Sequence, residues 1–106
     1  MIASIWIGND NLVTLTGLQD EFTGSFINGL ASGVTVKILN SEDGSLFAGP
    51  FTLDYIGSSN GNYHGILDSS LALVKGAAYQ IVIHVDDGTG ATAEWAEDVI
   101  ARVRAF

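Results

Sequence analysis

The chain has 106 residues, of which 47% are apolar and 15% are charged, and these proportions are typical of a folded globular domain. Its length predicts a single domain over residues 1–106 with one hydrophobic core. The chain contains no cysteine and has a formal net charge of −8, which excludes a disulfide framework and disfavours binding to nucleic acid or to anionic lipid.

The first segment, residues 2–7, is short, apolar and rich in β-forming residues, so we expect a strand there. Trp6 lies on the face opposite Ile5 and Ile7, where it either contacts a partner or is covered by the fold. The start has no basic residue and its apolar run ends by Gly8, which does not fit a signal peptide. No apolar run in the chain is long enough to cross a bilayer. We therefore expect a protein that is made and kept in a cytosol, or that is assembled there into something larger.

A second strand is predicted over residues 12–18. Residues 19–33 then form a long connection that is interrupted by turn-forming residues and has room for a short strand at 25–27. The connection also contains large apolar residues, among them Phe22 and Phe26. Such residues predict that the connection packs back onto the core or contacts a partner.

Alternation of apolar and polar residues predicts three further strands, over residues 34–39, 51–56 and 62–67. Asp43-Gly44 marks a hairpin turn after the first of them. Gly49-Pro50 interrupts the return of this hairpin. Because proline cannot donate to a ladder, we expect an edge strand or a change of sheet at that point.

The stretch 71–85 predicts an approach, a turn at Lys75-Gly76 and then a central strand. Four apolar residues alternate on one face of that strand: Tyr79, Ile81, Ile83 and Val85. The spacing of Gly76 and Tyr79 fits a tyrosine corner, in which the ring enters the core and the hydroxyl bonds to backbone upstream. The alternative is an ordinary half-buried strand tyrosine.

The C-terminal segment, residues 91–106, is compatible with two structures. Trp95, Val99 and Phe106 recur at helical spacing among good helix formers. Read with a period of two, Trp95 and Val99 share a face, but the acidic Glu97 joins them. The strands that precede the segment, and a turn that suits a hairpin, favour a closing strand. We therefore predict an all-β fold and keep the helix as the alternative for this segment.

The residues that could carry chemistry are few. His64 and His84 are expected on outward faces of strands, where they could meet across a sheet, but no third ligand has a recognisable spacing. Glu42-Asp43 and Asp86-Asp87 could hold Ca²⁺ if they lay together, although Asp beside Gly is also what turns require. There is no nucleophile elbow, phosphate loop or dinucleotide fingerprint. We expect no catalytic site, no cofactor and no metal.

Five short motifs are spread over residues 11–90: Asn11-Leu-Val-Thr-Leu-Thr-Gly-Leu18, Gly33-Val-Thr-Val-Lys-Ile38, Asp43-Gly44, Gly61-Asn-Tyr-His-Gly65 and Leu71-x-Leu-x-x-Gly76-x-x-Tyr79-x-Ile-x-Ile83. With these motifs the chain resembles the small immunoglobulin-like modules of tailed-bacteriophage virions. In such modules a turn of the Gly-Asn-Tyr type and a Gly-x-x-Tyr corner are typical. The resemblance implies an immunoglobulin-like antiparallel β-sandwich of about seven strands.

The resemblance also implies a virion structural protein without enzymatic activity, and a capsid decoration or cement protein is the preferred form. Its partners would be other virion proteins, such as the major capsid or tail proteins, and it would form a homo-oligomer in the assembly. Nucleic acid and membrane are not expected as partners. The candidate protein interface consists of Ile5, Trp6, Ile7, Phe22, Phe26, Trp95 and Phe106. Core packing is the alternative for each of these residues.

Other functions remain open at this level. A neck, tail or baseplate ring component would have the same fold and a different place in the virion. A carbohydrate-binding or adhesin-like module would use outward aromatic rings, with Trp6, Tyr63 or Trp95 stacking on sugars.

Overall fold

The structure is a computed structural model that describes residues 3–20, 23–30, 33–88 and 92–103. These residues form eight strands and no helix. In chain order the strands are β1 (Ala3–Trp6), β2 (Asn11–Leu15), β3 (Val34–Asn40), β4 (Leu46–Thr52), β5 (Asp54–Tyr55), β6 (Tyr63–Leu67), β7 (Ala78–Asp86) and β8 (Thr92–Arg102). The closing strand is thereby confirmed, and the helical alternative for the C-terminal segment is wrong over its described residues.

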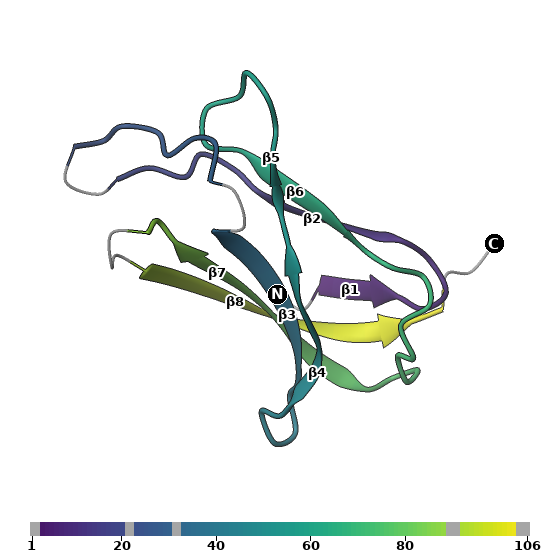
Figure 1. Cartoon of the computed structure of the whole chain (residues 1–106). Helices are drawn as coiled ribbons and strands as arrows, with labels where there is room; N and C mark the ends of the chain where they lie inside the picture. The colour runs from purple at the N-terminus through teal and green to yellow at the C-terminus, as the bar shows by residue number, and fades with distance from the viewer. Residues whose placement is uncertain (1–2, 21–22, 31–32, 89–91, 104–106) are drawn as a thin grey trace.

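The strands form two sheets that face each other (Figure 1). One sheet has five strands in the order β1-β8-β7-β3-β4, and the other has three in the order β2-β6-β5. β1 runs parallel to β8, whereas the other pairings of described strands are antiparallel. The all-β class is confirmed. The expectation of about seven antiparallel strands is corrected to eight strands with one parallel pair.

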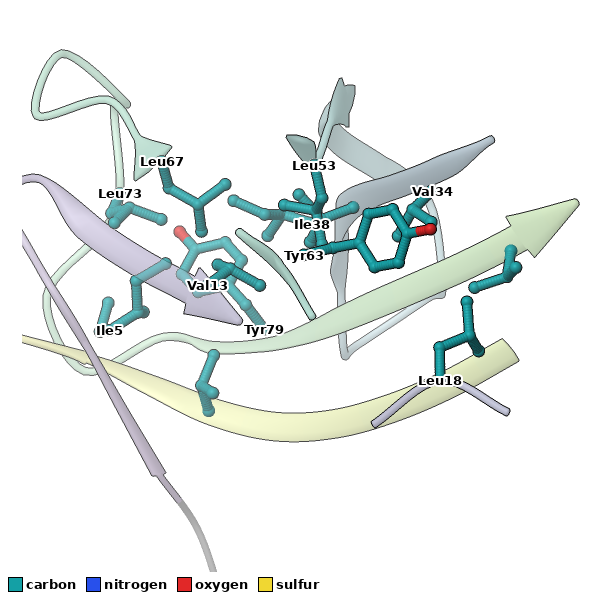
Figure 2. Packing of buried hydrophobic residues seen from close by; sticks show 14 residues of the cluster. Ile5, Val13, Leu18, Val34, Ile38, Leu53, Tyr63, Leu67, Leu73 and Tyr79 are labelled. Atoms are coloured by element: carbon teal, nitrogen blue, oxygen red, sulfur yellow. The ribbon is translucent and has the colours of Figure 1, made fainter. Parts of the chain in front are cut away.

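The core lies between the two sheets, where the inward residues of their strands meet (Figure 2). The five-stranded sheet contributes Val34, Val36 and Ile38 from β3, and the three-stranded sheet contributes Tyr63 and Leu67 from β6. Burying a side chain of this size removes enough apolar surface from water to favour folding by roughly 1.5–3 kcal/mol, before the cost in conformational entropy. The alternation of apolar residues in the sequence is therefore what holds the two sheets together.

Strand β7 has the predicted alternation. Its four core-facing residues pair with residues of β3: Tyr79 with Asn40, Ile81 with Ile38, Ile83 with Val36 and Val85 with Val34. Tyr79 is 2% exposed, and its hydroxyl accepts a hydrogen bond of 2.9 Å from the backbone N–H of Val74. The preceding Gly76 has a φ of +81°, a conformation that costs glycine little. The geometry of a tyrosine corner is thus confirmed for this residue.

The strand predicted over residues 51–56 is divided between the two sheets. β4 ends at the edge of the five-stranded sheet, and β5 begins two residues later in the other sheet. Leu53 makes the crossing: its side chain is buried, and its N–H donates to the backbone oxygen of Val34 at 2.8 Å. The cis Gly49-Pro50 peptide lies within β4, so the proline occupies an edge strand as expected.

The long connection between β2 and β3 is tied to the three-stranded sheet by Tyr63. The hydroxyl of Tyr63 donates to the backbone oxygen of Ile27 at 2.9 Å and accepts the N–H of Leu30 at 3.2 Å. The short strand expected in this connection is an isolated bridge between Gln19 and Phe26. The connection therefore packs back onto the core, which was one of the two expected outcomes.

Candidate protein-docking groove

Strand β8 is an edge strand over most of its length. On one side, β7 pairs with β8 from Thr92 to Ile100. On the other side, β1 pairs with residues 99–102, and no described strand pairs with residues 92–98. An edge strand of this kind presents backbone donors and acceptors to which another strand can pair.

The direction of the backbone groups alternates along β8. Ala101 donates its N–H at 3.0 Å to the β7 side of the sheet, whereas the oxygen of Arg102 accepts the N–H of Ile7 at 2.9 Å on the opposite side. The register between β7 and β8 contains no shift. The same alternation therefore directs the N–H and C=O groups of Glu94 and Ala96 to the free side of the strand.

The core-facing side of this edge opens into a hollow between the two sheets. The hollow has a volume of about 820 Å³, and β1, β2, β7 and β8 line it. Trp95 and Glu97 share the core-facing side of the sheet with Ile83 and Ile81, their direct partners on β7. Val13 of β2 belongs to the opposite sheet and also lines the hollow.

Trp95 also lines a second hollow of about 680 Å³, which extends toward the turn between β7 and β8. The connection between β2 and β3 contributes Leu18 and Ile27 to it, and β7 contributes Val85. Trp95, which is 46% exposed, lines both hollows. We call the two hollows together the β8 groove.

The charged residues that line the β8 groove are all acidic. They are Asp10 and Glu97 in the first hollow and Asp20 and Asp87 in the second, and no described Lys or Arg lines either one. The net charge of the whole chain, −8, has the same sign. The groove therefore combines apolar and polar lining residues with acidic side chains, and these acids attract cationic ligands and repel anionic ones.

The structure divides the residues of the predicted interface. Trp6 and Trp95 line the β8 groove, and Phe26 is 42% exposed on the connection. Ile5 is 1% exposed and belongs to the core, and Ile7 packs against that core, so both follow the core-packing alternative. Phe22 and Phe106 lie outside the described residues.

One expected outward ring is placed differently by the fold. Tyr63, which was considered for stacking on sugars, is 0% exposed, and its ring lies 5.4 Å from that of Tyr55. The expectation that Tyr63 faces outward is therefore wrong. Its hydroxyl is used for the backbone of the β2–β3 connection, which explains why a polar ring is stable at this depth.

Sequence reasoning missed the groove residues from β2 and β7. Val13, Ile81 and Ile83 have the pattern of ordinary core positions, and only the sheet pairings place them beside an uncovered edge. One local signal was present. Glu97 shares the face of Trp95 and Val99, and an acidic residue on the apolar face of a strand indicates that this face is open there.

The fold separates the two groups that were considered for metal binding. His64 is in β6 and His84 is in β7, and these strands belong to different sheets. Glu42-Asp43 lies in the β3–β4 turn, whereas Asp86 bonds to the backbone of Gly33 at the opposite end of β3 (Figure 1). Over the described residues, no three side chains of His, Cys, Asp or Glu form a group that could hold a metal ion.

Two acidic side chains with altered pKa values belong to turns. The Ser45 hydroxyl donates to Asp43 at 2.6 Å, and this bond is the main reason why the pKa of Asp43 lies below its ordinary value. The backbone N–H of Ser70 donates to Asp68 at 2.8 Å and lowers the pKa of Asp68 in the same way. Neither carboxylate lines the β8 groove. These bonds are therefore features of turns, where Asp commonly caps its own backbone.

Comparison of the chain with protein-family models, with curated proteins and with solved structures found no match. No helix of sufficient length and apolarity to span a membrane occurs in the part of the chain that the structure describes. The sequence motifs and the β8 groove are thus the two observations from which a function can be inferred.

Proposed function

We propose that this chain is a non-enzymatic module that acts by protein–protein association through the β8 groove and the free edge of β8. One observation carries the proposal. Trp95 is 46% exposed on an apolar sheet face, beside a strand edge that no described strand covers. Exposed aromatic side chains next to apolar surface contribute more than other residue types to protein interfaces. The acidic residues around Trp95 would form the polar rim of such an interface.

We also propose that the fold is immunoglobulin-like. The strand order supports this, because the chain changes sheet after β1, β2, β4 and β6, which resembles the Greek-key connectivity of immunoglobulin domains. The bond between the N–H of Val74 and the hydroxyl of Tyr79, at the start of β7, matches the tyrosine corner of those domains.

The specific role that we propose is that of a structural protein of a tailed-bacteriophage virion, with capsid decoration as the preferred form. The support is the motif resemblance, whose Gly61, Tyr63, Gly76 and Tyr79 all have defined roles in this fold. The partners would be the major capsid or tail proteins, and repeated copies would follow the symmetry of the shell. A neck, tail or baseplate ring is the alternative place in the same particle.

Quantitative mass spectrometry of purified particles tests this role. A decoration protein should occur in a copy number of the same order as the shell protein, because it follows a repeated site. A ring component should occur in a handful of copies. Absence from particles that contain the shell protein would reject the virion role and would leave association through the β8 groove to be tested by itself.

Carbohydrate binding is the second candidate function. The half-exposed Trp95 lines the same hollow as Asp10 and Glu97. Aromatic rings can stack on sugars, and carboxylates can accept hydrogen bonds from sugar hydroxyls. A glycan array, probed with and without Ca²⁺, distinguishes the two functions. Binding that is lost in Trp95→Ala would favour the sugar, and an array without any binding would reject it.

A further inference from the structure

We propose that the free edge of β8, residues 92–98, accepts an extended segment of a partner protein as an additional strand, and that this segment alternates basic and apolar residues. The inference rests on the proposed association function and specifies how the partner is held. Three features of the edge point to it: the direction of its backbone groups, the apolar residues of the groove on its inner side and the carboxylates of Glu94 and Asp98 on its outer side.

The backbone of the edge provides the main-chain part of the interaction. Glu94 and Ala96 direct their N–H and C=O groups away from β7, into the space beside the sheet. In the described register, β1 starts its parallel pairing opposite Val99. A strand added at residues 92–98 would therefore extend the ladder that β1 makes with β8 and would leave the pairing of β7 and β8 unchanged.

The inner side of the edge would select apolar side chains. Side chains directly opposite each other on neighbouring strands lie about 4.5–5.5 Å apart, so every second side chain of the added strand would enter the β8 groove beside Trp95. Val13 lines that part of the groove from the other sheet. Because this space is open to water and Val13, Ile81 and Ile83 contribute apolar surface to it, an apolar side chain placed against them would lose unfavourable contact with water.

The carboxylates of the edge would select basic side chains at the alternate positions. Glu94 and Asp98 lie on the outer side of β8, and Glu97 lies on its inner side. Oε1 of Glu94 lies 3.9 Å from Nζ of Lys37 and 3.8 Å from Nδ1 of His84. Such exposed pairs contribute little to stability, so the carboxylate can still accept another cation. A basic residue on the outer side of the added strand, beside Glu94 or Asp98, would form the charged cross-strand pairs that stabilise a sheet.

A second copy of this chain fits the edge less well than a cationic partner. If the free edges of two copies paired, each copy would bring Glu94, Glu97 and Asp98 to the same short ladder. Each copy also carries a net charge of −8. Like charges on adjacent strands are destabilising, so the acids of the edge oppose self-pairing while they favour a basic strand.

A synthetic peptide tests the proposal directly. The probe is a capped seven-residue peptide that alternates Lys and Val, and its binding to the intact chain is measured by calorimetry in low salt. Three matched peptides serve as comparisons: one with Glu in place of Lys, one with the same residues in scrambled order, and one that is N-methylated at alternate backbone positions. We expect the probe to bind at least about tenfold more tightly than each comparison peptide.

Variants of the edge locate the binding site. Ala96→Pro removes an N–H that faces the free side, and we expect an affinity loss of about tenfold, whereas Ala96→Thr keeps that N–H and the affinity. Trp95→Ala should weaken binding similarly. Phe51→Ala is its matched control, since Phe51 is an aromatic residue 37% exposed on the edge strand β4 at the other side of the sheet. Circular dichroism verifies that each variant is folded.

The possible results of these measurements distinguish a failure of strand addition at β8 from a failure of the proposed function. Equal binding of the N-methylated probe to the wild-type chain would overturn strand addition, even if Ala96→Pro failed to fold. Loss of binding in Trp95→Ala without loss in Ala96→Pro would leave a groove that binds side chains and would also overturn it. If no probe binds, strand addition by a basic segment is rejected, while the virion role remains decided by the copy number in particles.

Discussion

Gly61 occupies a position in which a side chain does not fit. Its φ is +70°, and a Cβ built there would lie 2.4 Å from the backbone oxygen and 2.6 Å from the backbone nitrogen of Leu18. The oxygen of Gly61 accepts the N–H of Leu18 at 2.9 Å, and its own N–H donates to the side chain of Asn28 at 2.7 Å. One glycine therefore fastens the start of the β2–β3 connection to the turn before β6.

We predict that Gly61→Ala is more destabilising than Gly44→Ala. Gly44 has a similar φ of +72°, but a Cβ there would meet nothing within 4 Å, so alanine should cost only about 1–2 kcal/mol for its left-handed conformation. At Gly61 the contact with Leu18 backbone should add at least about 1–3 kcal/mol. Urea denaturation of both variants measures the difference. Equal free energies of unfolding would show that the close approach to Leu18 is not rigid.

At the turn between β3 and β4, we predict that the pKa of Asp43 lies below its ordinary value of 3.8 and rises in Ser45→Ala. The hydroxyl of Ser45 is the largest cause of the lowered pKa, and its backbone N–H is the second. Since the pKa is lower in the folded chain, these bonds stabilise it above the unfolded pKa, and this contribution is lost as the pH falls through the folded pKa. Carboxyl NMR titration measures the pKa of Asp43 in the wild-type chain and in Ser45→Ala. An unchanged pKa in the variant would contradict the role of the Ser45 hydroxyl.

Among the structural elements, β8 shows how a strand can resemble a helix in its sequence. Among the described residues, no strand pairs with the outer edge of its first half, and Glu94, Glu97 and Asp98 are exposed there. Its second half, where β1 pairs with it, has Val99 and Ala101 buried. The strict two-residue period is therefore present only where both sides of the strand are covered.

We predict that amide hydrogen exchange alternates along β8. The amides of Trp95 and Glu97 face β7 and should be protected, whereas those of Glu94 and Ala96 face the free side and should exchange at close to the rate of an open chain. Exchange measured by NMR in the unbound protein tests this. Protection of Glu94 and Ala96 would mean that the edge is already covered in solution and would remove the basis for strand addition.

In the whole molecule, the sheet edges differ in the features that protect them from pairing with another chain. β4 carries Pro50 and shifts its register against β3, and β5 has only two residues, both of which limit pairing with another chain. β8 carries acidic residues instead, which discourage like-charged chains but would admit a basic one. We therefore expect the acidic residues of the β8 edge to favour a basic strand over an acidic one.

The stability of the two sheets also depends on Leu53, the residue at which the chain crosses from one sheet to the other. We predict that Leu53→Ala lowers the free energy of unfolding by about 2–5 kcal/mol, because Leu53 is fully buried between the sheets. Unfolding monitored by tryptophan fluorescence, which reports on the five-stranded sheet, and by exchange of amides in β6 should shift by the same amount. A shift in only one of these probes would show that the sheets unfold separately.

The sequence alone determined most of the strands, because alternation of apolar residues reflects burial on one face. Segments 34–39, 62–67 and 79–85 follow this rule, and they became β3, β6 and β7. The tyrosine corner was also predictable, since its glycine and tyrosine are close in the chain. Trp6 and Trp95 were among the residues proposed for an interface, and both line the β8 groove.

Only the tertiary structure decided which strands are neighbours, and the β8 groove depends on that. Val13 and Trp95 lie far apart in the chain, and they line the same hollow because β2 ends one sheet and β8 is next to the end strand β1 of the other. Local pattern could not place the change of sheet at Leu53, since Phe51 and Tyr55 continue the same alternation. It also could not separate the buried Ile5 from the half-exposed Trp95, because an apolar strand residue has the same pattern whether or not another strand covers it.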